Sequence, residues 1–519
     1  MYKNAHPLVT ERLRKVEELR RLGIDPYPQV AYRPTYTLAE VRRDAGALVA
    51  QRVRVKAAGR ILARREMGKV TFLDLLDDGV RVQAYFRLPE LGEQTWRVLG
   101  LLDLGDFAGV EGSVFHTRSG ELSIHVEVLT VLGKASHPLP LPKQQGEQVF
   151  SAITDKGFLY RHRHVGLVAD PASREAFLTR TRIVRGIRRY LDDEGFLEVE
   201  TPILGQAYGG AAARPFVTAI HSLSQPMFLR ISPECALKRL LCGGFNRVYE
   251  IGKNFRNEGI DASHNPEFTM VEWYEAYSDY LHQMERFETL VARLSEEVHG
   301  TTRITYRGRS LDLTPPWRRL SMLDGLRELA GLDLDKVDTE GMAEVFRRYH
   351  PEGVGALPEP LTWGAAVVAL FEALVEPRLW DPVFVMDHPL EISPLTKRHR
   401  TDPRLVERFE PMIAGMEVGN SYSELNDPLE QYERLASQQV AREAAYDLDE
   451  DFLQAVAHGM PPAGGTGLGV DRIVMILTGA RSLRDVILFP LVSRRGDGSA
   501  GPETVDVNAR AEVAAAEAS

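Results

Sequence analysis

Five short runs of alternating apolar and polar residues follow one another between Val53 and Leu132, and they constrain the fold more than any other feature. A period of two residues is typical of strands with one buried face. Five such strands in one compact segment, separated by glycines and charged turns, favour a small closed barrel of the OB type. We therefore predict an OB barrel at residues 51–135. The runs are VRVKAAGRIL, KVTFLDLL, VRVQAYF, DFAGVEGSVF and LSIHVEVLTVL.

The segments on either side of the barrel are predicted to be a helix and connectors. Apolar residues recur every third position between residues 10 and 22, with Thr10 as a candidate N-cap and Gly23 as a stop. This pattern indicates an amphipathic helix, so residues 1–50 are assigned to an N-terminal helix and its connector. The prolines of HPLPLPK mark a linker, which we assign to residues 136–174.

Residues 175–490 are predicted to form an α+β domain on an antiparallel sheet with flanking helices. Helical and strand-like runs are intermixed there without regular alternation, which favours this class. We expect a helical insertion at about 280–380 and, from its Gly, Ala, Ser and Glu content, a disordered tail at 491–519. The predicted helices are 175–195, 279–299 and 429–447, and the predicted strands are 226–231, 247–251, 266–274, 383–387, 410–417 and 467–470.

The composition excludes several classes of protein. A chain of 519 residues is too long for one core, so two or more domains are expected. Its start lacks the apolar run of a secretion signal, and no stretch of about 18 uncharged apolar residues could span a membrane. The two cysteines, Cys235 and Cys242, are too few for a disulfide-stabilised secreted chain. We expect a cytoplasmic protein without membrane attachment.

Charge is unevenly distributed along the chain, whose net charge is −10. Residues 1–150 hold 22 Lys and Arg against 18 Asp and Glu, whereas the remainder holds 41 against 55. A basic front end on an acidic body suits a polyanion that contacts the first domain. A solvated basic helix explains the same balance, so charge alone leaves both interpretations open.

The first cluster of chemically active residues is RVYEIGKNFRNEGIDASHNPEFTMVEWYEAY, residues 247–277. It is predicted to be a strand, a polar loop and a return strand, a hairpin that gathers charged and aromatic residues on one surface. Arg256 suits bidentate binding of a phosphate. Phe268 suits stacking under a planar base, and Glu272 suits binding of a cation. For any single charge here, a surface hairpin with ion pairs is the alternative.

The second cluster is FEPMIAGMEVGNSYSELND, residues 409–427. Glu410 and Glu417 could converge across a turn on Mg²⁺, which prefers carboxylate and phosphate oxygens together. Their spacing alone is common and indicates little. Asn420, Tyr422 and Glu424 lie on one face if the segment is extended, and such a polar face is unusual for burial unless a cation binds there.

The third cluster is GGTGLGVDRIVMILTG, residues 464–479, in which the glycines permit close approach of a ligand to the backbone. No Gly-Lys pair followed by Ser or Thr is present, so the run does not match a phosphate-binding loop. A preceding βαβ unit, as in a dinucleotide fold, is also lacking.

In this order the three clusters resemble the signature motifs of class II aminoacyl-tRNA synthetases. GFLEVETP at 195–202 resembles the first motif, at the dimer interface, FRNEG with HNPEFT the second, and GLGVDR the third. The resemblance covers about residues 10–490 and is greatest to lysyl-tRNA synthetases. It rests on GGAAARPF, ISPECALKRLLCGGFNRVYEI, HNPEFTMVEWYEAYSDY, EVGNSYSELND and SLRDVILFP.

The resemblance implies a homodimeric enzyme that activates L-lysine with ATP and loads it onto tRNA(Lys), with Mg²⁺ as cofactor. The implied catalytic residues are Arg256 and Arg472. The implied ATP-binding residues are Arg256, Glu258, His264, Asn265, Phe268, Glu410 and Arg472. The implied lysine-binding residues are Gly210, Glu234, Arg256, Glu272, Tyr274, Asn420, Tyr422, Glu424 and Gly467. The implied metal ligands are Glu410 and Glu417, and the implied anticodon-binding residues are Arg65, Phe72 and Gln83.

Within this pocket, the resemblance implies that Glu234 binds the α-amino group of lysine and that Glu424 and Tyr274 bind its side-chain ammonium. The sequence also departs from the family pattern. Ser263 stands where the family usually has an arginine, just before the motif-two histidine, and that arginine contacts ATP or tRNA. Met416 stands where the family usually has an arginine before the second predicted metal ligand.

Three rival functions remain open from the sequence. Aspartyl- and asparaginyl-tRNA synthetases share the fold, but an acidic substrate would be repelled by Glu272 and Glu424. The ligase that modifies elongation factor P lacks the barrel. A non-catalytic tRNA-binding protein derived from a synthetase commonly loses motif residues, which are retained here.

Overall fold

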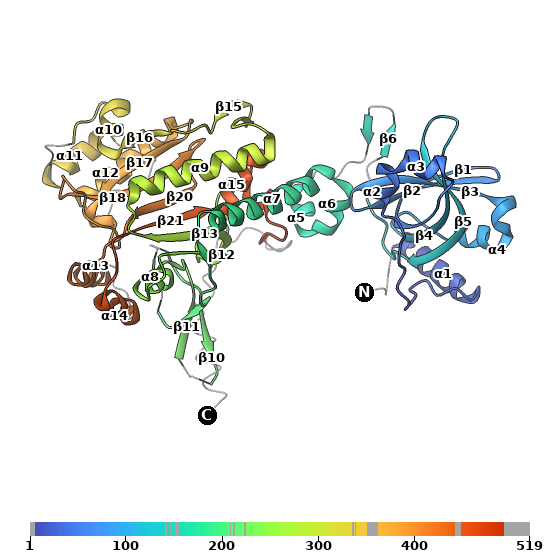
Figure 1. Cartoon of the computed structure of the whole chain (residues 1–519), viewed down its shortest axis with the longest axis horizontal. Coiled ribbons are helices and arrows are strands. Elements are labelled where there is room, and N and C mark those ends of the chain that lie inside the picture. Colours follow the sequence, from blue (N-terminus) through green and yellow to red (C-terminus); the bar gives the residue numbers. More distant parts are fainter. Residues whose placement is uncertain are drawn as a thin grey trace. The chain divides into compact units, whose positions relative to one another are not determined.

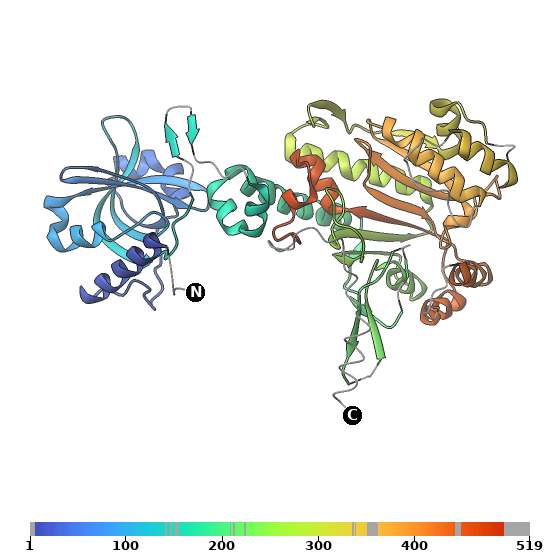
Figure 2. The same cartoon turned by 180° about the vertical axis from the view of Figure 1, so that it is seen from behind.

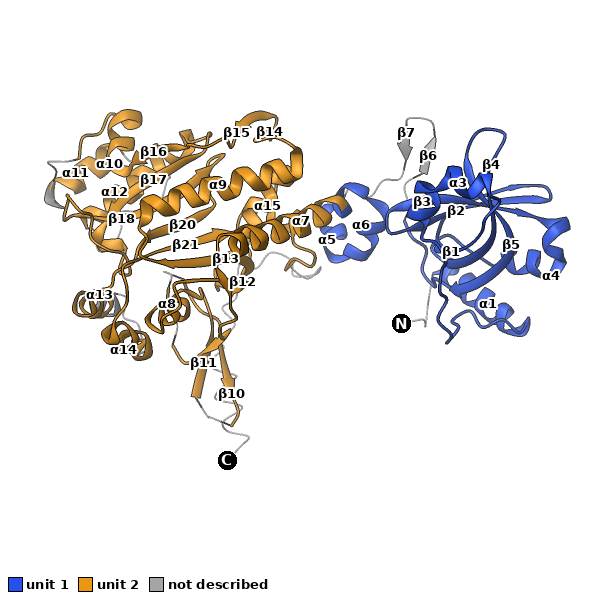
Figure 3. Cartoon of the chain, in the orientation of Figure 1, with its two compact units in different colours: residues 1–174 blue, residues 175–519 orange. Residues whose placement is uncertain are grey.

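The computed structural model describes residues 6–140, 143–145, 148–150, 155–207, 209–210, 213–222, 225–334, 337, 339–349, 362–441 and 448–492. The chain forms two compact units, Met1–Arg174 and Glu175–Ser519 (Figure 3). The predicted disordered tail lies almost wholly outside the described residues. None of the described helices is long and apolar enough to cross a membrane.

The first unit contains the predicted OB barrel. Its strands close in the order β1-β2-β3-β5-β4 (Figure 1), which confirms the prediction of five strands. Alternate side chains such as Leu73, Leu75 and Phe86 fill the interior. The turn between the second and third strands is Asp78-Gly79, both at positive φ, as a two-residue hairpin with right-handed twist requires. The strands are β1 (Arg54–Met67), β2 (Val70–Asp77), β3 (Val80–Arg87), β4 (Phe107–His116) and β5 (Leu122–Gly133).

Helices surround the barrel at more places than the sequence predicted. The first helix begins after His6, with Pro7 in its first turn, and not at Thr10. A helix between β3 and β4 was not predicted, and two short helices and a two-stranded ribbon lie in the predicted linker. These elements are α1 (Pro7–Arg21), α2 (Leu38–Arg43), α3 (Ala45–Ala50), α4 (Leu88–Gly100), β6 (Lys143–Gln145), β7 (Gln148–Phe150), α5 (Lys156–Arg161) and α6 (Arg163–Ala169).

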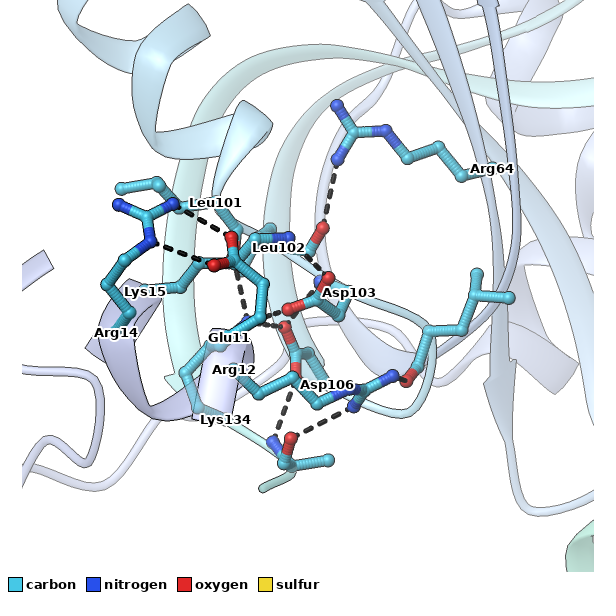
Figure 4. Close-up of polar contacts among 12 residues, drawn as sticks. Glu11, Arg12, Arg14, Lys15, Arg64, Leu101, Leu102, Asp103, Asp106 and Lys134 are labelled. Atoms are coloured by element: carbon cyan, nitrogen blue, oxygen red, sulfur yellow. Dashed lines mark hydrogen bonds and ion pairs between the residues drawn. The ribbon is translucent and has the colours of Figure 1, made fainter. Parts of the chain in front are cut away.

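A buried ion-pair network fixes α1 to the barrel (Figure 4). The fully buried ammonium of Lys134 lies 2.7 Å from Asp103 and 2.5 Å from Asp106. Lys15 of α1 reaches the other oxygen of Asp103 at 2.6 Å. Because removing one partner of such a buried pair leaves an uncompensated charge, the network strongly favours this one position of α1.

The second unit is built on one mixed sheet in the order β16-β17-β18-β20-β21-β13-β12-β8, with β19 paired to β18. The inner pairs are antiparallel, as predicted, whereas the outer pairs β16–β17 and β12–β8 are parallel. Bounds are β8 (Leu197–Glu198), β12 (Arg247–Phe255), β13 (Glu267–Ala276), β16 (Arg318–Ser321), β17 (Val383–Pro389), β18 (Leu405–Ile413), β19 (Met416–Glu417), β20 (Gly419–Ser423) and β21 (Ala463–Gly469).

Smaller elements flank this sheet. The predicted strand at 226–231 lies in a separate sheet, β10-β11-β9, and the predicted helical insertion also contains the β14–β15 hairpin. Residues 350–361 of that insertion and 442–447 of the third predicted helix lie outside the described residues. Bounds are β9 (Leu204–Gly205), β10 (Val217–Ile220), β11 (Gln225–Leu229), β14 (Arg303–Tyr306) and β15 (Arg309–Asp312).

Helices cover one face of the main sheet. α9 runs across it (Figures 1 and 2), between the N-cap Asp279 and the left-handed Gly300. Side chains that point to this face, such as Val271 and Trp273, form the core with α7, α9 and α15. Bounds are α7 (Pro171–Asp193), α8 (Glu234–Cys242), α9 (Tyr280–His299), α10 (Met322–Gly325), α11 (Thr339–Tyr349), α12 (Trp363–Leu374), α13 (Pro428–Ala441), α14 (Glu450–His458), α15 (Val470–Thr478) and α16 (Leu483–Val486).

Candidate active site

A cavity of about 680 Å³ opens on the opposite face of the main sheet. Because side chains alternate along a strand, the neighbours of the core residues Val271 and Trp273 point the other way, and Glu272 and Tyr274 line the cavity. Much of the remaining wall comes from β18, β20 and β21, from the loop after β12, and from the starts of α8 and α15.

A strand of glycines forms the floor of the cavity. In β21, Gly465 pairs with Tyr274 and Tyr422 of the adjacent strands, and Gly467 pairs with Glu272 and Asn420. A Cβ atom at Gly465 would stand 2.3 Å from the ring of Tyr274, closer than atoms approach one another. The alternate glycines therefore create the space that larger residues would fill.

Arg256 is an unpaired cation in this cavity. Its guanidinium lies over the ring of Phe268, 5.1 Å from the centroid. Its buried Nε has no hydrogen-bond partner among the described residues, and no ion pair joins it to any of them. The hairpin fixes it, because the Arg256 N–H donates to the Pro266 carbonyl at 2.9 Å. A half-buried arginine without a carboxylate partner among the described residues is suited to an anion.

His264 and Arg472 lie next to each other on the same wall. His264 Nδ1 lies 2.8 Å from Asp261, and its Nε2 lies 3.4 Å from Arg472 Nη2. Burial acts to raise the pKa of Asp261, but hydrogen bonds from the backbone N–H of Ser263 and from the His264 ring lower this pKa to about 2. Ser263, which stands where the family has an arginine, also bonds to Asp261 through its hydroxyl at 3.0 Å.

Two predicted metal ligands, Glu410 and Glu417, line the cavity together. Arg408 donates to Glu410 at 2.6 Å and to Asn420 at 2.9 Å. Arg472 donates to the Glu417 carbonyl at 2.5 Å. Burial and then the nearby Glu410 raise the pKa of Glu417, as expected where carboxylates gather without a cation.

The donor set fits a hard cation that shares ligands with a phosphate. Among the described residues, no group of three or more Asp, Glu, His or Cys is arranged to hold a metal. Two carboxylates beside an anion-binding arginine therefore supply part of the coordination that Mg²⁺ prefers, and substrate oxygens would supply the remainder.

Glu272 is a buried carboxylate at the centre of the cavity. Ser232 donates to one of its oxygens at 2.7 Å and Tyr274 to the other at 2.9 Å. Burial, and then the charge of Glu234, raise the pKa of Glu272 to about 7. Gly210 lies against Glu234, where a Cβ would come within 2.9 Å of the glutamate side chain.

Glu424 is fully buried, and its carboxylate lies against Gly465. Its Oε1 accepts no hydrogen bond from any described residue, and the carboxylate forms an ion pair with the fully buried Lys238. Lys238 also donates to Glu234 at 2.6 Å. The hydroxyl of Tyr274 donates to Glu272 at 2.9 Å, and its ring lies with Glu424 against Gly465.

The structure brings nearly all predicted residues of this site together. Glu424 is the exception, because it is fully buried beside Gly465 and does not line the cavity. The individual roles of the predicted site residues stay predictions. Lining the cavity are Gly210, Glu234, Arg256, Glu258, His264, Asn265, Phe268, Glu272, Tyr274, Glu410, Glu417, Asn420, Tyr422, Gly467 and Arg472.

Sequence reasoning missed several residues in and beside the site, among them Ser232, Lys238, Arg408 and Gly465. Two of them carried a signal. Arg408 is two residues before Glu410 and so shares its face of β18, and Gly465 has the same alternation as Gly467. Lys238 is four residues from Glu234, a spacing that on a helix usually marks an exposed ion pair.

The predicted anticodon residues lie on the outer face of the barrel. Phe72 is half-buried, outside the barrel core, with its ring 5.3 Å from that of Tyr85. Arg65 pairs with Asp74 at 2.9 Å. Gln83 is only 8% exposed and accepts a hydrogen bond from the Ser123 hydroxyl at 2.9 Å. Phe72 therefore offers a ring face, whereas the Gln83 amide is already engaged.

The barrel and the cavity together define a class of enzyme, the class II tRNA synthetases. Residues 155–493 match the family model of tRNA synthetases class II (D, K and N). Residues 55–132 match the OB-fold nucleic acid binding domain of the anticodon-binding family.

Relatives narrow the class further. A lysine–tRNA ligase of Pelotomaculum thermopropionicum is 45% identical over 493 residues, which cover 94% of this chain and 95% of the relative. Lysine–tRNA ligases of Moorella thermoacetica and Carboxydothermus hydrogenoformans are 46% and 44% identical, over 97% and 99% of their own lengths. The chain belongs to the lysine–tRNA ligase family of class II synthetases.

Proposed function

We propose that this enzyme activates L-lysine with ATP, releasing pyrophosphate, and then transfers lysine from lysyl-adenylate to the 3′ end of tRNA(Lys). The observation that carries the proposal is the charge of the cavity. Of three buried carboxylates, Glu234 and Glu424 share the buried cation Lys238, and the third, Glu272, forms no ion pair with any described residue; nor does the cation Arg256. Such an arrangement favours a ligand with two ammonium groups and one carboxylate.

Lysine has this pattern of charges. Its carboxylate would pair with Arg256, its α-ammonium with Glu234 beside Gly210, and its side-chain ammonium with Glu424 beside Gly465. Glu272, Tyr274, Asn420, Tyr422 and Gly467 would line the pocket between these ends. The buried carboxylates would repel an aspartate side chain, which disfavours that substrate.

ATP would bind at the adjoining wall. Phe268 and Arg472 would enclose the adenine ring, and Arg256 would hold the α-phosphate. Glu258, His264 and Asn265 would contact adenine and the triphosphate. The unpartnered Nε of Arg256 and the position of His264 beside Arg472 support this assignment.

Glu410 and Glu417 would hold Mg²⁺, which supplies charge neutralisation at the phosphates when bound. Arg408 would keep Glu410 in position, because it joins that carboxylate to Asn420 of the lysine pocket.

The chemistry requires no protein base. The lysine carboxylate is ionised at neutral pH and attacks the α-phosphorus of ATP in line, with pyrophosphate leaving. Arg256 orients both reactants and stabilises charge on the α-phosphate, so positioning and electrostatics provide the rate enhancement. The terminal adenosine hydroxyl of the tRNA then attacks the carbonyl of the adenylate.

The OB barrel would recognise the anticodon of tRNA(Lys) through Arg65, Phe72 and Gln83. The half-buried ring of Phe72 on the outer face supports stacking with a base. Gln83 would read a base edge through its amide, and Arg65 would exchange its contact with Asp74 for one with the nucleic acid.

We also propose a cytoplasmic homodimer with residues 195–202 at its interface. Leu197, Ile203 and Leu204 are exposed apolar residues in and beside this segment, as an uncovered interface requires. Sedimentation equilibrium of the full chain tests this proposal: a dimer is expected, and a monomer at micromolar concentration would exclude it.

ATP–pyrophosphate exchange, measured separately with each of the twenty amino acids, tests the proposed activity. We expect exchange with lysine and background rates with aspartate and asparagine. Exchange that prefers another amino acid, or none at all, would refute the proposal.

A further inference from the structure

Lys238 is a lysine of the protein itself, enclosed by the carboxylates that the proposed function assigns to the substrate. Its side chain is fully buried, and its Nζ donates to Glu234 at 2.6 Å. The same ammonium forms an ion pair with Glu424. One resident cation therefore joins the two carboxylates proposed to bind the two ammonium groups of L-lysine.

The packing around Lys238 leaves its ammonium no access to water. Its Nζ lies 5.2 Å from the ring centroid of Tyr422 and 5.8 Å from that of Phe452, which α14 supplies. Burial alone would lower the pKa of Lys238, but Glu234 and Glu424 overcome it and raise the pKa, so the group stays charged. The titratable groups of this cluster, from α8, β13 and the β20 segment, are Glu234, Glu272, Tyr274, Tyr422 and Glu424.

Lys238 supplies the one positive charge among the buried carboxylates of the pocket. Fully ionised, the three carboxylates and this ammonium would carry a net charge of −2, which the two ammonium groups of the substrate would balance. Without Lys238 that net charge would be −3. Since a buried carboxylate without a cation neutralises itself by binding a proton, that proton would then compete with the substrate ammonium.

We propose that Lys238 is a positioning residue that sets specificity for L-lysine, because its fixed ammonium pairs with Glu234 and Glu424 and holds both carboxylates in position for the two ammonium groups of the substrate. This inference rests on the proposed function. Lys238 does not face the cavity, so it acts through the two glutamates and not by touching the substrate.

The variant Lys238→Met tests the inference, because methionine has similar length and no charge. The lysine KM in pyrophosphate exchange should rise at least about tenfold, since the variant leaves buried charges unpaired. The ATP KM should change less than twofold. Calorimetry of lysine binding at pH 8 in two buffers of different ionisation enthalpy should give about one more proton released by the variant than by the wild type.

Lys134→Met is a matched control in the other unit. Lys134 is likewise fully buried between two carboxylates, Asp103 and Asp106 (Figure 4), so its loss has the same generic effect on folding. This variant should melt at a lower temperature, with an unchanged lysine KM and unchanged proton release. Lys238→Gln, which retains a hydrogen-bond donor without charge, replaces the methionine variant should that variant not fold.

Comparison of the wild type with the variant decides the inference. At pH 8, lysine binding to the wild type should release fewer protons than binding to Lys238→Met, because burial raises the pKa of Glu424 and the ammonium of Lys238 opposes that rise. Equal or greater release by the wild type would overturn the inference, as would a Lys238→Met enzyme whose lysine KM equals that of the wild type. A wild type without lysine-dependent exchange would instead refute the proposed function itself.

Discussion

Gly465 lies against Glu424, and a Cβ atom on this glycine would stand 2.1 Å from Glu424 Oε1. That oxygen accepts no hydrogen bond from any described residue, and glycine leaves room here for the side chains of Glu424 and Tyr274. This relationship connects the glycine-rich β21 to the proposed selection of lysine, because any side chain at Gly465 would displace the carboxylate proposed to bind the substrate ammonium.

Gly465→Ala should therefore block lysine binding. Overpacking of this kind costs about 1–3 kcal/mol, so we expect the lysine KM to rise roughly ten- to a hundredfold in pyrophosphate exchange. Gly469→Ala is a control on the same strand, because its Cβ meets neighbours only at ordinary distances of 3.5 Å and more. Equal lysine KM values for the two variants would show that lysine binding does not depend on the position of Glu424 against Gly465.

Glu424→Gln should impair lysine binding far more than ATP binding. The substitution removes a buried carboxylate from Lys238 and from the proposed substrate ammonium, a loss on the order of 3–5 kcal/mol. The lysine KM should rise at least about a hundredfold while the ATP KM stays nearly constant. Parallel changes in both constants would place the side-chain ammonium elsewhere.

Glu417→Ala should abolish adenylate formation and leave tRNA binding intact, because the barrel is a separate compact unit. Loss of one of two carboxylates leaves the proposed Mg²⁺ with too few protein ligands. The measurements are lysine-dependent exchange and tRNA(Lys) binding by filter retention. Exchange near the wild-type rate at ordinary Mg²⁺ concentration would exclude Glu417 as a ligand.

Phe72→Ala should weaken charging of tRNA(Lys) and spare amino-acid activation. Stacking of a base on an aromatic ring contributes about 1–3 kcal/mol, which corresponds to roughly a ten- to hundredfold loss in kcat/KM for tRNA. Because Phe72 lies outside the barrel core, the melting temperature should change little. A variant that loses both activities together, or melts much earlier, would indicate a structural role.

Binding of lysine should improve as pH rises through about 7. The pKa of Glu272 is raised to about 7, so this carboxyl is largely protonated below that pH and cannot balance an ammonium group. The lysine KM should fall by up to about tenfold per pH unit below pH 7 and level off above it. The same raised pKa means that Glu272 lowers the stability of the ligand-free enzyme as pH rises from about 4.5 to 7. A lysine KM independent of pH between 6 and 8 would contradict this assignment.

The sequence predicted the barrel and the faces of the central strands well. Alternation in β13 put Phe268 and Glu272 on one side, and both line the cavity. It could not predict that Lys238 pairs with Glu424, because these residues are far apart in the chain and only the packing of α8 against the sheet brings them together.

Other differences have similar physical reasons. The helix α1 begins earlier than predicted because Pro7 is favourable in a first turn, where its missing N–H has no partner to lose. The engaged amide of Gln83 depends on Ser123 of a neighbouring strand, a pairing that is set by the closure of the barrel and not by local pattern.

Discrimination between lysine and norleucine tests the central claim most directly. The two amino acids share the same unbranched chain, and norleucine lacks the terminal ammonium. A pocket built around the buried Glu424 and Glu272 should leave these carboxylates uncompensated when norleucine binds, so kcat/KM for exchange should fall by about ten-thousandfold or more. Exchange with norleucine within about tenfold of that with lysine would show that the buried carboxylates do not select the substrate.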